Sequence, residues 1–263
     1  MSGVISIHNS GFFSCCSVKL ELIVRFINQR KTLPEYVDSS TVFEVYKIDK
    51  QQDITFDYFE HYDNVESNML IGTTHIDYYQ TYQYNNYHLL DYQRITPVVE
   101  KYFTPSRLIK YIIENIEQKY RLDYENTCVL FYRGNDKVIE TQLCEYSDYV
   151  TYAYSILQKN PNIKFLIQSD ETEFIEYFTI LFPNNSFYFK DEIRHMTKRV
   201  DTVDKVFSHQ NNMYSKYYLA ITIIMSRCEH VVCGSGNCSI WIMLYRGNSH
   251  NVYQYNQSMW LCP

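Results

Sequence analysis

Glycine and proline are scarce in this chain of 263 residues, which contains seven glycines and six prolines. Each remaining glycine is therefore more informative about a local backbone requirement. A run of about twenty apolar residues is also missing, which argues against a membrane-spanning helix. The first residues, 1–8, have neither a basic segment nor a long apolar core, so we expect no signal peptide.

Positive charge is not in excess either. The 24 lysines and arginines are outnumbered by 30 acidic residues, which gives a formal net charge of −6. Proteins that bind nucleic acids normally present a basic face, so we expect no nucleic-acid partner. A few well-placed groups could still bind a phosphate locally. The hydrophobic share of 46% and charged share of 21% are typical of a globular protein.

The eight cysteines contain no CxxC pair and are not combined with a histidine-rich metal pattern. Reduced and mostly buried thiols are the simplest interpretation. A cytosolic (cytoplasmic) location is the default expectation that follows.

Strand-like and helical patterns alternate through the second half of the chain. Strands are predicted at 127–132, 163–168, 186–189, 230–233 and 251–255, and helices at 147–158, 171–182, 210–227 and 237–244. Such alternation indicates βαβ units and a mostly parallel, doubly wound α/β sheet.

The first half is harder to interpret. A strand is predicted at 4–8, a helical pattern follows over 18–27, and a second helix is predicted at 105–120. The tyrosine-rich stretch 38–93 has weak periodicity, and we expect only short strands and helices there. The change of pattern near residue 122 predicts two domains, 1–122 and 123–263.

Ligands of open α/β sheets bind beyond the carboxyl ends of the strands. The first polar loop in such a position, 132–140, has Arg133 at the strand end. An arginine there can form a bidentate bond to a phosphate and stays charged. Asp136, Lys137 and Glu140 add charges of both signs, which suits an anionic, polyhydroxylated ligand. A solvated turn with a surface ion pair is the alternative.

The second polar loop begins with Ser169 and Asp170, directly after the predicted strand 163–168. Either side chain could simply cap the helix that follows, since acidic and hydroxyl groups satisfy the first amides of a helix. The loop lacks the second aspartate of a DxD motif, so we expect no metal site here.

The third polar loop, 233–239, reads CGSGNCS between a strand and a helix. Glycines allow a tight turn, and the amides of a helix N-terminus form a ready anion site. Ser235, Asn237 and Ser239 add side-chain donors. The loop is neither a P-loop nor a dinucleotide-binding GxGxxG motif. A diphosphate held between these amides and Arg133 is electrostatically coherent.

Together, the three loops resemble the donor-binding domain of fucosyltransferases of the α1,2, α1,6 and protein-O types. Segment 131–137 matches that family's first motif at an arginine, an aspartate and a lysine, and 169–171 is similar to its Ser/Thr-Asp-Asp. Segment 225–241 resembles the Met-Ser, Cys, His, serine-rich turn and Trp of the α1,2 group. The loop 9–13 is similar to the family's opening glycine-rich loop. The resemblance covers residues 125–255 best.

The resemblance implies a GT-B-like fold, in which two Rossmann-like domains face a cleft. It also implies a sugar-nucleotide donor, a glycan or protein acceptor, inversion at the anomeric carbon, and no metal or other cofactor. The residues that it implies for catalysis are Arg133, Asp136 and Glu140. The residues that it implies for donor binding are Gly11, Lys137, Ser169, Asp170, Ser235, Gly236, Asn237, Cys238 and Ser239.

Within that resemblance, Arg133 would stabilise the leaving diphosphate, the electrostatic role that usually dominates such transfers. Asp136 and Lys137 would contact the donor sugar. Glu140 is the candidate general base, although the family's comparable glutamate aligns with Thr141.

Two positions depart from the family. Its histidine before the arginine is Phe131 here, and an acidic residue of the long helix aligns with Ile221. Both family positions meet the guanine base in some members, and apolar groups remove hydrogen-bond partners that would select guanine. GDP-fucose is therefore the leading donor, and another nucleoside-diphosphate sugar is the alternative.

A protein that kept this fold but lost turnover, and now binds a nucleotide sugar or a glycan, is the main rival to an active glycosyltransferase. The two departures and the register of Glu140 support that rival. A phosphate-binding hydrolase or kinase is disfavoured, because the sequence has neither a nucleophile elbow nor a P-loop.

Overall fold

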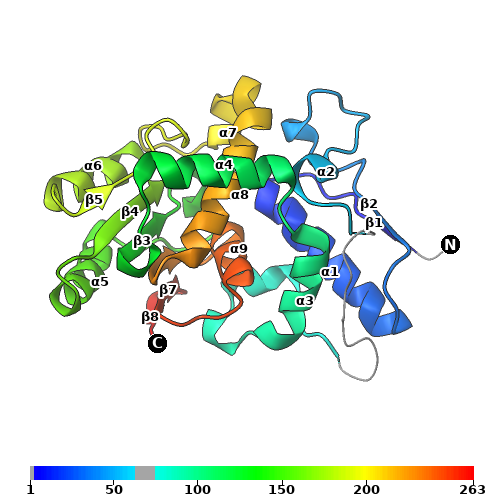
Figure 1. Ribbon diagram of the computed structural model, residues 1–263, viewed down its shortest axis with the longest axis horizontal. Coiled ribbons are helices and arrows are strands. Elements are labelled where there is room, and N and C mark those ends of the chain that lie inside the picture. Colours follow the sequence, from blue (N-terminus) through cyan, green and yellow to red (C-terminus); the bar gives the residue numbers. More distant parts are fainter. Residues whose placement is uncertain (1–2, 63–74) are drawn as a thin grey trace.

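The computed structural model describes residues 3–62 and 75–263 (Figure 1). Its helices are α1 (Phe12–Arg30), α2 (Thr55–Tyr58), α3 (Tyr92–Phe103), α4 (Arg107–Tyr120), α5 (Tyr146–Lys159), α6 (Thr172–Leu181), α7 (Val203–Val206), α8 (Asn211–Arg227) and α9 (Asn237–Arg246). Its strands are β1 (Gly3–Ile5), β2 (Tyr36–Asp38), β3 (Thr127–Tyr132), β4 (Lys164–Ser169), β5 (Ser186–Phe187), β6 (His230–Gly234), β7 (Val252–Asn256) and β8 (Met259–Leu261).

The C-terminal half is built on a sheet with the strand order β5-β4-β3-β6-β7-β8. Neighbouring strands from β5 to β7 are parallel, and β8 pairs antiparallel with β7. The chain winds outward from β3 in one direction and then from β6 in the other. The predicted mostly parallel α/β sheet is confirmed, and its topological switch point, where such folds bind ligands, lies between β3 and β6.

The central strand β3 is buried over its whole length, as expected for a parallel strand covered on both faces. Its side chains alternate between these faces. Tyr132 stacks on Phe174 of α6, with ring centroids 4.8 Å apart. Phe131 and Arg133 face the other side, where they line a cavity with Ile221 of α8. The alternation therefore directs Arg133 toward the side of the sheet that α8 covers.

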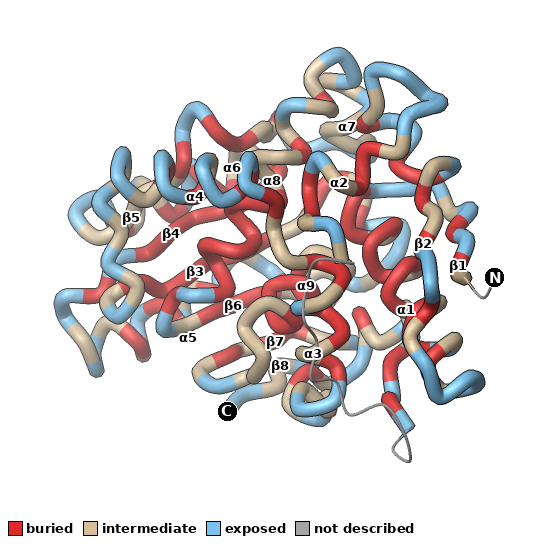
Figure 2. Tube along the Cα trace, turned by 45° about the vertical axis from the view of Figure 1, so that its right-hand side comes forward, coloured by how far each residue is buried: buried red, intermediate tan, exposed pale blue. Residues whose placement is uncertain are grey.

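The N-terminal half packs directly on this unit. Its described strands, β1 and β2, form a short parallel pair. Helix α1 lies against α9, where Trp241 Nε1 donates a 2.9 Å hydrogen bond to Ser17 Oγ. Helix α4, which precedes the predicted boundary at residue 122, packs on α8. Buried segments accordingly continue from one half into the other (Figure 2).

Most predicted elements are found within a few residues of their expected ends. The helix predicted at 105–120 begins after Ser106, whose hydroxyl accepts from the Ile109 amide. Helix α3, which contains Pro97 in its interior, was not predicted. Between residues 38 and 93 the structure has β2, α2 and short 3-10 turns, and residues 63–74 of that stretch lie outside the described part.

Six of the eight cysteines are buried, while Cys238 is half-buried and Cys262 is exposed, which confirms the expectation of mostly buried thiols. Within 3–62 and 75–263, none of the helices combines the length and the apolar character needed to cross a bilayer.

Candidate functional site

The three polar loops predicted from the sequence meet at the carboxyl ends of β3, β4 and β6, beside the N-terminus of α1. A cavity of about 900 Å³ lies between the first loop, the start of α9 and the start of α1, whereas Ser169 and Asp170 of the second loop line a smaller cavity beside it. The predicted residues that line it are Gly11, Arg133, Asp136, Lys137, Glu140, Asn237 and Cys238. Residues 9–14, 44–46, 50, 80 and 83 line its N-terminal side, and residues 202–205 form another part of the wall.

Arg133 lies between two carboxylates. Its Nε is 3.2 Å from Asp170 Oδ2, and its Nη2 donates to Asp136 Oδ1 at 3.1 Å. Within the described residues, Nη1 has no hydrogen-bond partner. The guanidinium is therefore oriented by one hydrogen bond to Asp136 and by the charge of Asp170, while its buried Nε makes no hydrogen bond within the described residues.

Asp170 does not cap a helix, which was the alternative for the second loop. Its Oδ1 accepts a 2.9 Å hydrogen bond from the Gly134 amide, while Oδ2 faces Arg133. The side chain is 4% exposed. Ser169 makes the short-range hydrogen bond instead, since its hydroxyl accepts from the Glu171 amide at 3.0 Å. Asp170 of the second loop therefore holds Arg133 and the Gly134 amide of the first loop in position.

Glu171 also links the second loop to the first. It is fully buried, its Oε1 accepts from the Asn135 amide at 2.7 Å, and its Oε2 accepts from the Tyr146 hydroxyl. A Cβ at Gly134 would lie 1.9 Å from Glu171 Oε1, so the carboxylate occupies the space that a side chain would need. Asn135 adopts a left-handed backbone with φ 43° and donates its side-chain amide to the Asp170 carbonyl. Asn135 was not predicted, because its contacts are long-range.

Lys137 and Glu140 form an ion pair at the edge of the large cavity. Lys137 is buried, whereas the Glu140 side chain is 43% exposed and also accepts from the Tyr84 hydroxyl at 3.0 Å. Gly236 has φ 153°, and a Cβ there would touch Lys137 Cε at 3.5 Å. Because 3.5 Å is an ordinary van der Waals distance, the glycine is required here by its positive φ and not by lack of space.

The ionisable groups respond differently to these surroundings. Burial raises the pKa of Asp136, with the Asp170 and Glu140 charges adding to the effect of burial while Arg133 opposes it. Burial also acts to raise the pKa of Glu140, but the Lys137 ammonium outweighs it, so this pKa is lowered. Burial alone would lower the pKa of Arg133, yet the Asp170 and Asp136 carboxylates raise it. Arg133 is consequently a permanent cation.

The third loop is divided between structural and cavity-facing groups. Ser235 donates both its amide and its hydroxyl to the Tyr255 carbonyl, each at 2.9 Å, and the Ser239 hydroxyl donates to the Gly234 carbonyl. Neither serine lines the large cavity. Their predicted phosphate contacts stay predictions, and Ser239 could make one only through its amide.

Asn237 and Cys238, the first residues of α9, do line the large cavity. Asn237 Oδ1 is buried and has no hydrogen-bond partner among the described residues. The first amides of α9 lack intrahelical acceptors, as in every helix, and carry the positive end of the helix dipole. This helix end and Arg133 both border the cavity.

Gly11 caps the N-terminus of α1 at the opposite wall, and open space surrounds the position that its Cβ would occupy. The next amide, that of Phe12, is already used, because it donates to the Tyr46 hydroxyl at 2.7 Å. Tyr46 in turn donates to Asp204 Oδ2 at 2.8 Å.

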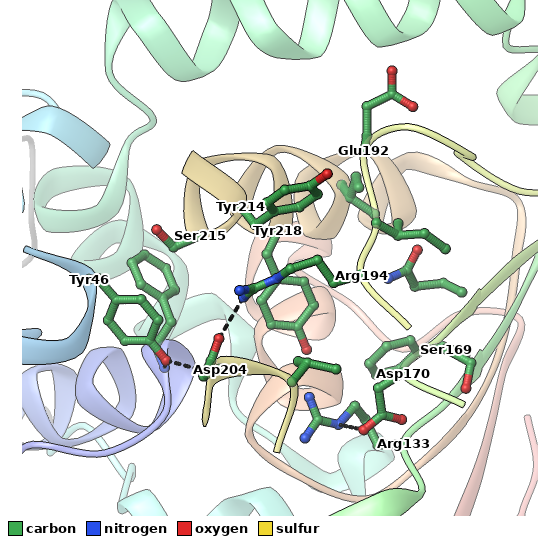
Figure 3. Close-up of a pocket in the computed structure, with 16 residues that line it drawn as sticks. Tyr46, Arg133, Ser169, Asp170, Glu192, Arg194, Asp204, Tyr214, Ser215 and Tyr218 are labelled. Atoms are coloured by element: carbon green, nitrogen blue, oxygen red, sulfur yellow. Dashed lines mark hydrogen bonds and ion pairs between the residues drawn. The ribbon is translucent and has the colours of Figure 1, made fainter. Parts of the chain in front are cut away.

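A second, smaller cavity of about 50 Å³ adjoins Arg133 (Figure 3). Phe131 and Ile221, the two positions that depart from the fucosyltransferase pattern, both line it. Arg194 and Asp204 form a 2.6 Å ion pair in its wall. Neither was predicted, because neither lies in a motif and their pairing depends on the path of the 190–210 segment.

Comparison of the whole structure with solved proteins identifies the fold. The NodZ α-1,6-fucosyltransferase structure soaked with GDP-fucose matches with a TM-score of 0.58 and 10% identity, covering 100% of this chain and 98% of the other. The Bradyrhizobium fucosyltransferase NodZ matches with a TM-score of 0.51 and 11% identity, over 99% and 98% of the two chains. The fold is fucosyltransferase-like.

A third structure, NodZ co-crystallised with GDP, has the same fucosyltransferase-like fold, with a TM-score of 0.52 and 10% identity over 97% of this chain and 95% of the other. No protein-family model and no curated protein matches the sequence. In the described ranges, no cluster of three or more histidine, cysteine or acidic side chains is arranged to hold a metal ion.

Proposed function

We propose that this protein is a metal-independent, inverting glycosyltransferase that transfers a sugar, first of all fucose from GDP-fucose, to a glycan or protein acceptor. The observation that carries the proposal is Arg133, oriented by two carboxylates at the switch point of a fucosyltransferase-like fold, with Nη1 left for a ligand. The GT-B division into domains 1–122 and 123–263 and a cytosolic location are parts of the same proposal.

The donor diphosphate binds between Arg133 and the first amides of α9. Arg133 Nη1 donates to a phosphate oxygen, and Asn237 and Cys238 lie at the positive end of the helix. As the bond between the anomeric carbon and the β-phosphate oxygen breaks, its electron pair leaves with the diphosphate. A fixed cation stabilises this developing charge at little cost in reorganisation. Gly11 and Ser169 border the donor, while Ser235, Gly236 and Ser239 shape the turn.

The acceptor hydroxyl attacks the anomeric carbon and gives its proton to a carboxylate. Asp136 suits this role, because burial raises its pKa and makes it the better proton acceptor. Glu140 remains a candidate, but its ion pair with Lys137 lowers its pKa. We assign Glu140 first to holding Lys137 beside the donor sugar.

A nucleotide-sugar-binding protein without turnover is the second candidate. It is favoured by the pairing of every carboxylate in the first loop, since Asp136 contacts Arg133 and Glu140 contacts Lys137. A protein whose candidate bases are both engaged could bind a donor and leave it intact.

A panel of nucleoside diphosphates, read by thermal shift and followed by assays of donor turnover, tests the proposal. GDP should raise the melting temperature, and Arg133→Ala should abolish both that shift and turnover. Arg25→Ala, at an exposed arginine of α1 paired with Glu21, is the matched control.

Stabilisation by UDP or dTDP alone would contradict fucose as the sugar. Turnover by Arg133→Ala at nearly the wild-type rate would refute the catalytic role of this residue. GDP binding without turnover of any sugar nucleotide would favour the binding protein.

A further inference from the structure

Tyr87 connects the N-terminal half of the chain to the third polar loop. It is fully buried and begins the 3-10 turn η4 (Tyr87–Leu89). Its hydroxyl accepts a 3.1 Å hydrogen bond from the Gly236 amide and has two acceptors within reach, the Gln83 carbonyl at 2.9 Å and the Gly236 carbonyl at 3.3 Å. One hydroxyl therefore joins the third loop to a segment that lies 149 residues earlier in the sequence.

Side chains of β7 hold the segment around Tyr87 in place. Gln254 Oε1 accepts from the Tyr87 amide at 2.9 Å, and its Nε2 donates to the Asn85 carbonyl at 2.8 Å. Asn256 Nδ2 donates to the Tyr84 carbonyl at 2.9 Å. The backbone of this segment is thus fixed to the sheet of the C-terminal half, so the Tyr87 hydroxyl has a defined position.

Gly236 is the point of the third loop at which such a contact matters most. It is the N-cap of α9 and has φ 153°, a conformation that glycine adopts without strain. Because a glycine restrains the chain least, the direction of the helix start depends on what holds its peptide groups. The Gly236 carbonyl accepts from the Ile240 amide at 3.0 Å, within the helix, and the Gly236 amide is held by Tyr87. Tyr87 therefore orients the first turn of α9.

The same contact decides which amides remain for a ligand. The Gly236 amide is used by Tyr87, whereas the amides of residues 237–239 have no backbone acceptor in the part of the chain that the structure describes. Asn237 and Cys238 line the large cavity. The groups that a bound anion would meet therefore begin one residue after the one that Tyr87 holds.

Two unpartnered oxygens indicate that a ligand binds where α9 packs against the turn η3 (Gln80–Tyr84). Gln83 is 4% exposed and lines the large cavity, and its Oε1 has no hydrogen-bond partner within 3–62 and 75–263. The same holds for Asn237 Oδ1 on the α9 side. Native proteins leave few buried acceptors unsatisfied, so this pair favours a ligand with O–H or N–H groups. Tyr87 holds the backbone on both sides of this part of the cavity.

We propose that Tyr87 is a positioning residue for the donor diphosphate. Through Gly236 it directs the first amides of α9 into the large cavity, which Arg133 also lines. The residues that contact the diphosphate then come from the C-terminal half, and the residue that orients them comes from the N-terminal half. The proposal rests on the proposed function, because it takes the start of α9 as a diphosphate site.

Tyr87→Phe tests this role, since it removes the hydroxyl and keeps the ring. We expect it to weaken the binding of inorganic pyrophosphate and of GDP about fivefold or more by calorimetry, because the amides that meet the phosphates are no longer held in direction. The two ligands should lose affinity equally, since both present a diphosphate to the same amides.

Tyr245→Phe is the matched control. The Tyr245 hydroxyl, at the other end of α9, donates to the Phe103 carbonyl at 3.0 Å. Both variants lose a hydroxyl that bonds to the backbone, so both should lower the ligand-free melting temperature. Only Tyr87→Phe should weaken pyrophosphate binding, and a purely structural role would not produce that difference.

Two further measurements decide the matter if Tyr87→Phe does not fold. Asn256→Ala removes one contact between this segment and β7 and should weaken pyrophosphate binding by a smaller factor. In the wild-type protein, saturating GDP should slow hydrogen exchange at the Tyr87 amide, because a ligand that orders the start of α9 also orders the segment bonded to it.

The outcomes separate this proposal from the proposed function. If the wild-type protein binds GDP and pyrophosphate, then unchanged affinities in folded Tyr87→Phe, or an equal loss in Tyr245→Phe, would overturn the positioning role alone. Unchanged affinity in Asn256→Ala together with unchanged exchange at Tyr87 would do the same. If the wild-type protein binds neither ligand, the proposed function fails and the role of Tyr87 fails with it.

Discussion

The coupling between Arg133 and Asp170, which orients the arginine, can be measured without a substrate. Asp170 is 4% and Arg133 21% exposed, and the closest approach is 3.2 Å. At an effective dielectric constant of about 20, two unit charges at that distance attract by roughly 5 kcal/mol before desolvation. Desolvation and the partial exposure of Arg133 reduce this value, so we expect a net coupling of about 1–3 kcal/mol.

A double-mutant cycle measures this coupling. Asp170→Asn removes the charge but keeps an oxygen for the Gly134 amide, and Arg133→Met removes the cation with little change in volume. Each single variant leaves the partner's charge in a poorly hydrated place. The double variant should therefore be less destabilised than the sum of the two single variants, by the coupling energy, in urea unfolding.

The matched control is the exposed pair Arg25 and Glu21 on α1, four residues apart, for which the same cycle should give less than about 0.5 kcal/mol. Additivity within about 0.5 kcal/mol at Arg133 and Asp170 would refute the reasoning, because it would mean that Asp170 does not hold the arginine.

Three further predictions concern stability. Gly134→Ala places a Cβ 1.9 Å from a buried glutamate oxygen and should cost about 1–3 kcal/mol by thermal unfolding, whereas Gly11→Ala, with open space around it, should be neutral. Tyr46→Phe removes a hydroxyl that accepts a backbone amide and donates to a carboxylate, and should cost about 1–3 kcal/mol by the same measurement. The pKa of Glu140 is lowered by Lys137, so the stability from this pair should be present above the unfolded pKa of about 4.3 and lost as pH falls through the folded value. Glu140→Gln should remove this part of the pH dependence; an unchanged profile would show that the pair does not contribute.

The sheet could be predicted because its strands are short apolar runs separated by helical patterns. Buried parallel strands have this character on both faces, and β3 was predicted with its observed ends. Helix α3 could not be predicted in the same way. Pro97 in its interior removes a backbone donor and normally ends a helix, whereas here the helix is capped by Asp91 and packs against α1 and α9.

The candidate site was predicted in part for a similar reason. Strand ends can be recognised in a sequence, so the positions of Arg133 and Asp170 at one sheet edge followed from the pattern. The hydrogen-bond partner of each side chain depends on the register of the strands. Ser235 was expected to face a ligand, but β7 brings the Tyr255 carbonyl within reach of both its amide and its hydroxyl.

The charges around the first loop decide how a diphosphate could bind. Arg133 and Lys137 supply two positive charges, and Asp136, Glu140 and Asp170 supply three negative ones, so the loop region does not attract an anion through its net charge. An anion would therefore be attracted by a few oriented groups: Arg133 and the first residues of α9 border the same cavity, whereas Asp136 and Asp170 face Arg133 and Glu140 faces Lys137. Carboxylates that hold a cation in place weaken its attraction for a bound anion but fix its orientation. A fixed cation favours the transfer reaction, because the leaving diphosphate must be stabilised more strongly than the bound donor.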